Sequence, residues 1–167
     1  VVVDGEAVVA GTLFLKSNVT LEIAAGTTLR CADAPDAFPQ VATAYPCLTT
    51  GQRALLVAVG QTDIRVCGPG SLDGNGTVLR AACERAGAAR VSLLRFVDCV
   101  GVEVTDLALH SASSWTQHYL RCDRLRVSGV RVDNLRVEGL NDDGLNIDGC
   151  HGVSVRGRDI RTHDDGI

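Results

Sequence analysis

The sequence predicts an all-β fold, a right-handed single-stranded parallel β-helix (a β-solenoid) that forms one domain over residues 1–167. Three observations predict it. Short apolar segments alternate with polar residues, as in strands that bury one face. A unit of 22–28 residues recurs with its apolar positions in register, which is typical of a solenoid. The composition combines 46% hydrophobic residues and 18 glycines with only 4% aromatics, which suits short strands joined by tight corners.

The repeat is clearest in three segments that begin at Cys99, Cys122 and Cys150 and align over eleven residues at offsets of 23 and 28. Apolar residues occupy the third, fifth and tenth positions after each cysteine: Val102, Leu125 and Val153; Val104, Val127 and Val155; Leu109, Val132 and Ile160. Looser copies occur earlier, at 19–23 and 64–66. We expect successive coils to stack at about 4.8 Å. A leucine-rich repeat has a similar period, but its leucine-rich consensus and its helical half are missing.

The seven cysteines lie 16 or more residues apart, so the chain has no Cys-x-x-Cys pair to seed a zinc site. Their odd number leaves at least one thiol unpaired. The repeat places Cys99, Cys122 and Cys150 in one column of side chains. We expect these to be buried apolar thiols rather than a disulfide.

Charge and hydropathy argue against two classes of partner. The 16 Lys and Arg and the 20 Asp and Glu are mixed along the chain, with a formal charge of -4. A basic surface for nucleic acid or an anionic membrane is therefore not expected. No apolar run approaches the roughly 20 residues of a transmembrane helix. The chain has no Met and no signal-peptide pattern, so we expect a processed chain or a piece of a longer one.

Carboxylates cluster near the end of the chain. Residues 141–144 are Asn-Asp-Asp-Gly and residues 163–166 are His-Asp-Asp-Gly, so Asp143 and Asp165 lie 22 residues apart. One turn of the predicted solenoid separates them, which stacks the first motif on the second. Neighbouring carboxylates repel one another, and this raises the proton affinity of at least one of them. Hydrolysis of a glycosidic bond needs one protonated carboxyl for the leaving oxygen and one carboxylate to activate water or attack the sugar.

A purely structural role is the alternative for these motifs. Asn and Asp before Gly are common corner residues, so Asx turns alone would account for each motif. Successive side chains of a regular strand point to opposite faces. Asp164 and Asp165 therefore share a cleft only if the backbone bends or bulges there.

The two motifs resemble the Asn-Thr-Asp-Gly and Gly-Asp-Asp signatures of glycoside hydrolase family 28, the polygalacturonases. Three upstream segments also resemble that family and occur in the same order: residues 15–23 with Gly26, the glycine-rich turn at 68–76, and Ser114-Trp115. The likeness covers almost the whole chain. The sequence departs from the family pattern at three positions, where Asp142 replaces Thr, His163 replaces Gly and Gly166 replaces Cys.

The resemblance implies a pectin-lyase-like β-helix and an inverting hydrolase that cleaves the α-1,4-galacturonan of pectin. By position, Asp164 matches the general acid, while Asp143 and Asp165 match the pair that activates water. Four further residues are candidates for substrate binding: Asn141, Asp142, His163 and Trp115. The indole of Trp115 would stack on a sugar ring, or pack as a wedge beneath a loop. The implied enzyme uses no metal and no cofactor, binds a polysaccharide, is a monomer when full length, and is secreted or periplasmic.

Two other functions stay open. A polysaccharide lyase or uronate epimerase on the same fold would bind calcium through its aspartates. A non-catalytic solenoid would bind glycans without cleaving them. Val1 and Ile167 fall inside predicted rungs, so we expect a chain truncated at both ends that is inactive, or nearly so, by itself.

Overall fold

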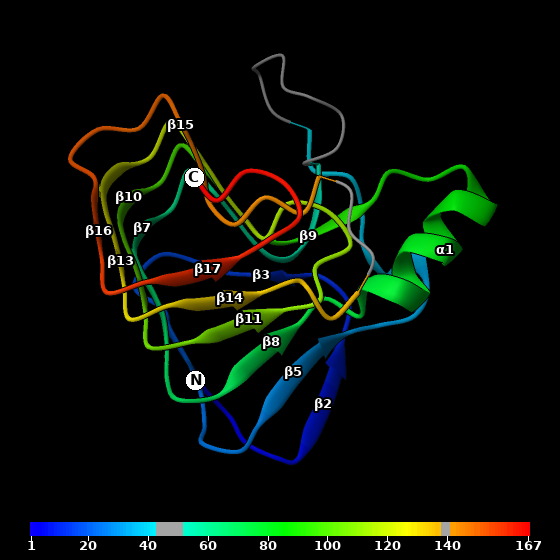
Figure 1. Ribbon diagram of the computed structural model, residues 1–167. Coiled ribbons are helices and arrows are strands. Elements are labelled where there is room, and N and C mark those ends of the chain that lie inside the picture. The colour runs from blue at the N-terminus through cyan, green and yellow to red at the C-terminus, as the bar shows by residue number, and fades with distance from the viewer. Residues whose placement is uncertain (43–51, 138–140) are drawn as a thin grey trace.

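The computed structural model describes residues 1–42, 52–137 and 141–167, which form a parallel β-helix. The chain coils through three parallel sheets, here named sheets A, B and C. Each full coil adds a strand to sheet C, then to sheet A, then to sheet B. Figure 1 shows the strands of sheet B stacked from β2, in blue, to β17, in red.

The strands of each sheet follow one another along the solenoid. Sheet A contains β1 (Val2–Val3), β4 (Thr20–Ile23), β7 (Thr62–Cys67), β10 (Val100–Thr105), β13 (Asp123–Ser128) and β16 (Ser154–Arg156). Sheet B contains β2 (Ala7–Ala10), β5 (Thr28–Cys31), β8 (Ser71–Asp73), β11 (Ala108–His110), β14 (Arg131–Asp133) and β17 (Asp159–Arg161). Sheet C contains β3 (Leu13–Phe14), β6 (Arg53–Val59), β9 (Val91–Val97), β12 (Gln117–Leu120) and β15 (Asn146–Asp148).

Strand register confirms the predicted repeat. Residues that align in the sequence pair across neighbouring strands and form continuous apolar columns. The column in sheet A is Leu21, Val66, Val104, Val127 and Val155, and the column in sheet B is Leu29, Leu72, Leu109, Val132 and Ile160. Most of these side chains are buried, so the three sheets enclose one core that runs along the solenoid.

An α-helix, α1 (Gly76–Ala86), interrupts the strand pattern between β8 and β9, where the repeat predicts none. Two side chains of the helix, Leu79 and Cys83, lie one turn apart and are fully buried against the core. The helix ends at Gly87, whose φ of 59° is the left-handed conformation that glycine adopts without strain. Figure 1 shows α1 outside the coil, beside the ends of the sheet B strands. A short 3-10 helix, η1 (Pro35–Ala37), packs against it. Because α1 buries only two side chains, its helical pattern is weak in the sequence.

The predicted cysteine column is present, with Cys99 and Cys122 buried as expected and Cys150 only partly buried. Val100 pairs with Asp123, and Asp123 forms a bridge with His151, so the cysteine before each of them occupies the same place on successive coils. The Cys122 N–H donates to Cys150 Sγ at 3.3 Å. The six cysteines within the described ranges are free thiols, while Cys47 lies outside the described residues. Within those same ranges, no helix is long and apolar enough to cross a membrane.

Candidate active site

The structure brings the two carboxylate motifs together at the N-terminal end of β15 (Asn146–Asp148), the last strand of sheet C. Residues 141–144 lead into β15, and residues 163–166 follow β17 one coil later. The Gly144 N–H donates to the Asp165 carbonyl at 2.9 Å, which holds the two segments side by side. A Cβ at Gly144 would lie 2.8 Å from the Gly166 carbonyl oxygen, so this close approach of two backbones requires glycine. The predicted stacking of the two motifs is therefore confirmed.

Asp143 lies partly enclosed at this junction, with an exposed fraction of 8%. Burial is the largest cause that raises the pKa of Asp143, and repulsion from Asp164 and Asp165 raises it further. Hydrogen bonds to the backbone and with Asn146 act in the opposite direction. The sequence predicts the repulsion but not the desolvation, because solvent access depends on how the coils cover the carboxyl group.

Asp164 and Asp165 are exposed, and the backbone bends at His163 and Asp164. The bend meets the condition under which two successive side chains serve one site. Both Asp164 oxygens accept hydrogen bonds, Oδ1 from the Asp165 N–H at 3.0 Å and Oδ2 from Asn141 Nδ2 at 3.3 Å. The Thr162 hydroxyl donates to the Asp164 carbonyl at 2.8 Å and supports the bend.

Arg90 joins the cluster although the sequence gives no sign of it. It lies between α1 and β9 and is 51 residues from Asn141, but its guanidinium donates to Asn141 Oδ1 at 2.7 Å. This contact fixes the orientation of the amide, since the guanidinium has donors only and must face the oxygen. The Asn141 amide nitrogen is consequently directed at Asp164.

Asp142 has a different environment from its neighbours. It is fully buried. The ring nitrogen Nδ1 of His163 lies 2.9 Å from Asp142 Oδ2, and the backbone N–H of His163 donates to Asp142 Oδ1 at 3.2 Å. The His163 side chain is 35% exposed. These residues, which are two of the departures from the family pattern, therefore contact each other.

A buried polar frame holds the Asp142–Gly144 corner. The side-chain amide of Asn134 donates to the Asp142 carbonyl at 2.8 Å and to Thr116 Oγ1 at 2.7 Å. The Thr116 N–H donates to the Asp143 carbonyl at 2.8 Å. Gln117 Nε2 donates to the Gly144 carbonyl at 3.1 Å. Asn134, Thr116 and Gln117 are all buried. No sequence pattern marks them, because isolated polar residues carry no periodic signal.

Trp115 precedes this frame by one residue and is half-buried. Its ring packs edge-on against His118, with 4.9 Å between centroids and 78° between planes. His118 is buried, and its Nδ1 accepts a hydrogen bond from Arg95 at 2.9 Å. Burial and the Arg95 charge lower the pKa of His118 to about 4. The indole is thus supported on one side by a neutral imidazole.

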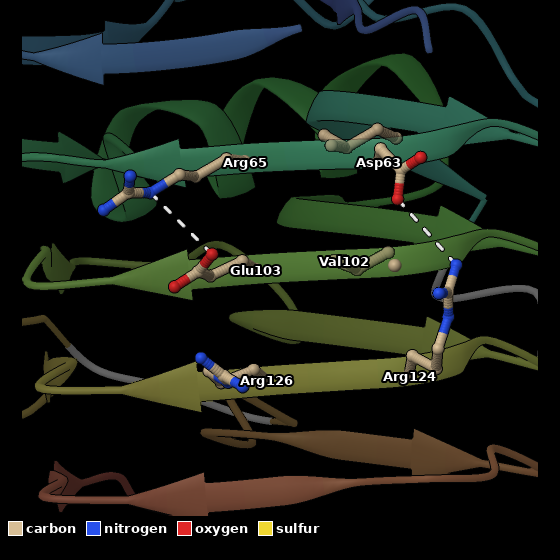
Figure 2. A pocket seen from close by; sticks show the side chains of 8 residues that line it. Asp63, Arg65, Val102, Glu103, Arg124 and Arg126 are labelled. Atoms are coloured by element: carbon tan, nitrogen blue, oxygen red, sulfur yellow. Dashed lines mark ion pairs between the residues drawn. The ribbon is translucent and has the colours of Figure 1, made fainter. Parts of the chain in front are cut away.

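A separate groove of about 320 Å³ lies over sheet A. Figure 2 shows its charged side chains on β7, β10 and β13. Arg65 Nε lies 4.0 Å from Glu103 Oε2, and an Arg124 nitrogen lies 3.8 Å from Asp63 Oδ1. Such exposed pairs contribute little to stability. The acidic groups of this groove face arginines, whereas Asp143 faces other carboxylates, so the unusual electrostatics lie at the carboxylate cluster before β15.

The carboxylate cluster is suited to proton transfer. Asp143 interacts electrostatically with the exposed Asp164 and Asp165, and its environment, burial above all, favours its protonated form. Within the part of the chain that the structure describes, no group of three His, Cys, Asp or Glu side chains is arranged to hold a metal ion. Carboxyl groups of adjoining coils thus lie together on a solenoid, an arrangement of the kind that hydrolysis of a glycosidic bond requires.

Comparison with protein families identifies the family. The family model of the glycosyl hydrolases family 28 matches residues 8–167, and the chain belongs to this family. No curated protein matches the chain at a significant level.

Solved structures share the fold. A protein from Parabacteroides merdae described as a glycosyl hydrolase is 24% identical, with a TM-score of 0.83 over 98% of this chain and 71% of that one. The family 28 exopolygalacturonase of Yersinia enterocolitica is 19% identical, with a TM-score of 0.76 over 91% of this chain and 37% of its own. A hyperthermoactive exopolygalacturonase from Thermotoga maritima is 18% identical, with a TM-score of 0.78 over 94% and 43%. These similarities confirm the predicted right-handed parallel β-helix, and the chain spans less than half of either exopolygalacturonase.

Proposed function

We propose that the protein hydrolyses α-1,4-galacturonan-type pectic polysaccharide by inverting general acid/base catalysis. The observation that supports this most directly is the convergence of Asp143, Asp164 and Asp165 at one junction, where burial, together with repulsion from Asp164 and Asp165, raises the pKa of Asp143. Membership of family 28 supports a glycosidase, and the exopolygalacturonase neighbours suggest the pectic substrate. Asn141 and Trp115, beside the cluster, are proposed to bind the sugar.

In this mechanism Asp164 carries a proton and delivers it to the glycosidic oxygen as the bond to the anomeric carbon breaks. Asp143 and Asp165 take a proton from a water molecule that attacks the anomeric carbon from the opposite face. One proton leaves Asp164 and one arrives at the base pair, so the charge of the site is conserved. Attack from the opposite face inverts the anomeric configuration.

Substitution of each carboxyl group tests the catalytic assignment. In the full protein in which residues 1–167 occur, we expect Asp143→Asn, Asp164→Asn and Asp165→Asn each to lower the release of reducing ends from polygalacturonate by about 10²–10⁴-fold. Asp159→Asn is the matched control, since Asp159 is an exposed aspartate on β17 paired with Arg161. Undiminished hydrolysis by Asp164→Asn would remove the assignment. Proton NMR of the first product tests the stereochemistry, because inversion of an α-linkage releases a β-anomer.

The roles of Asp143 and Asp164 need a test of their own. Family position assigns the acid to Asp164, whereas burial raises the pKa of Asp143 and would suit it to the same task. An aryl galacturonide has a leaving group that needs little protonation. The variant that loses the acid should therefore lose much less activity on the aryl substrate than on the polymer. We expect this pattern for Asp164→Asn and not for Asp143→Asn.

Product analysis separates hydrolysis from the lyase alternative. A lyase leaves an unsaturated, ultraviolet-absorbing sugar end and loses activity on chelation of calcium. We expect reducing ends without new ultraviolet absorption, and no effect of a chelator.

Three further proposals concern the whole protein. We propose that it is secreted or periplasmic and a monomer at full length. We also propose that residues 1–167 are inactive, or nearly so, by themselves, since they span 37% and 43% of the two exopolygalacturonases. Assay of residues 1–167 beside the full protein in which they occur tests the last point.

A further inference from the structure

The pairing of Asp142 with His163 calls for an explanation. A carboxylate removed from water is costly unless it accepts good hydrogen bonds. Asp142 is fully buried, and His163 provides both a ring nitrogen at 2.9 Å and a backbone N–H at 3.2 Å. The family signatures that the chain resembles have Thr and Gly at these positions. Both departures therefore belong to one interacting unit that bridges two coils.

The contact with Asp142 bears on which ring nitrogen of His163 carries hydrogen. Beside an ionised carboxylate, which only accepts, Nδ1 of His163 would be the donor. In the neutral ring, Nε2 is then the acceptor. The two nitrogens lie on opposite sides of Cε1, so Nε2 faces away from buried Asp142. The side chain is 35% exposed and belongs to the residue before Asp164, so part of the ring lies at the surface beside the candidate site.

We propose that Asp142 is a positioning residue that holds the His163 ring, and that His163 Nε2 accepts a hydrogen bond from a hydroxyl of the bound sugar beside the bond to be cleaved. This inference rests on the proposed function, and it assigns a specificity-determining contact to that site. If the pair had only a structural role, any side chain that donates a hydrogen bond to Asp142 would be sufficient. The imidazole adds a second polar atom, on a partly exposed ring that adjoins Asp164 in the chain. Hydroxyl groups are the donors that every pyranose offers to such an acceptor.

The tautomer of His163 is the first test, and its readout does not depend on activity. Long-range proton–nitrogen NMR of the purified protein distinguishes a ring protonated at Nδ1 from one protonated at Nε2. We expect neutral His163 to carry its hydrogen at Nδ1, and Asp142→Ala to lose this preference. Protonation of neutral His163 at Nε2 in the unaltered protein would overturn the proposal.

Sugar binding is the second test, measured by calorimetry with galacturonate oligomers in an Asp164→Asn background so that the ligand is not cleaved. Asn reproduces the position of Nδ1 but has no counterpart of Nε2. We therefore expect His163→Asn to melt like the parent and to bind about tenfold more weakly. His163→Ala should lose both thermal stability and affinity. His151→Asn is the matched control, because His151 is an exposed histidine on a different corner, between β15 and β16.

The outcomes separate this inference from the proposed function. If His163→Asn binds the oligomers as tightly as the parent does, the ring serves only to satisfy Asp142 and the inference fails while the proposed function stands. If the protein with Asp164 intact cleaves polygalacturonate but no His163 variant changes the affinity for the oligomers, the same conclusion follows. If the Asp164→Asn protein does not bind the oligomers and the protein with Asp164 intact does not cleave them, the proposed substrate is wrong and the inference falls with it.

Discussion

At the scale of single residues, two adjacent aspartates have opposite environments. Asp142 is fully buried and hydrogen-bonded to His163, whereas Asp143 retains 8% exposure and is repelled by Asp164 and Asp165. Each environment suits a different task, since a satisfied carboxylate holds its partner in place and a destabilised one takes up a proton readily. The chemistry of the site therefore depends on which way each carboxyl group faces rather than on the number of acidic residues.

Arg90 gives a prediction at this scale. Its guanidinium orients the Asn141 amide toward Asp164, so Arg90→Gln should leave the amide free to rotate. We expect kcat on polygalacturonate to fall about tenfold with little change in KM, which corresponds to the loss of roughly one hydrogen bond of about 1.4 kcal/mol. Arg85→Gln is the control, because Arg85 lies exposed in the last turn of α1. Equal kcat values for the two variants would contradict the proposed orientation.

His118 gives a prediction for stability against pH. Its pKa is lowered from 6.5 to about 4 by burial and by Arg95, so the unfolded chain binds the proton more tightly than the folded chain. The stabilisation that comes from keeping His118 neutral should be fully present above about pH 6.5. The free energy of unfolding should then decrease as the pH falls toward 4, by at most about 3 kcal/mol.

Urea unfolding at a series of pH values measures this effect. His118→Asn is the comparison, because its side-chain oxygen can accept the hydrogen bond from Arg95 but does not titrate. The variant should show a smaller loss of unfolding free energy between pH 6.5 and 4 than the unaltered protein does. Parallel curves for the two proteins would show that His118 is not the titrating group.

At the scale of elements, the site depends on corners rather than on strands. The polar frame of Asn134, Thr116 and Gln117 connects the approach to β12 with the approach to β15. Strand register sets how the coils stack, but the frame sets the path of the backbone between them. The frame therefore fixes the position of the Asp143 backbone.

Asn134 gives a prediction at the scale of elements. Its side chain accepts from the Ala112 N–H at 3.0 Å and donates to Thr116 and Asp142. We expect Asn134→Ala to lower the free energy of unfolding by about 3 kcal/mol, at about 1 kcal/mol for each hydrogen bond. Leu135→Ala is the control, since Leu135 is 53% exposed, and it should change stability little. Thermal unfolding followed by circular dichroism compares them, and equal melting temperatures would rule out the structural role of the frame.

At the scale of the whole molecule, the solenoid has one core without a boundary between coils. Leu72 is fully buried in the sheet B column between Leu29 and Leu109. Each coil contacts the coils on either side, so a defect in one coil weakens its neighbours.

Leu72→Ala tests this continuity. We expect a loss of about 2–5 kcal/mol in the free energy of unfolding, because the cavity lies between two packed coils. Val78→Ala, at a position that is 43% exposed on α1, should cost little. Urea unfolding of both variants checks the difference, and a Leu72→Ala protein as stable as the control would argue against a continuous core.

The sequence by itself determined the coil, its register and the stacking of the two carboxylate motifs. These features repeat with a period of 2 along each strand and of 22–28 residues between coils, so local patterning carries them. Only the tertiary structure decided the burial of Asp142, the approach of Arg90 to Asn141, the frame around Asn134 and the position of α1. Each depends on one polar or apolar side chain meeting a distant corner. The path of a corner follows from packing between coils, and no periodic signal in the sequence encodes it.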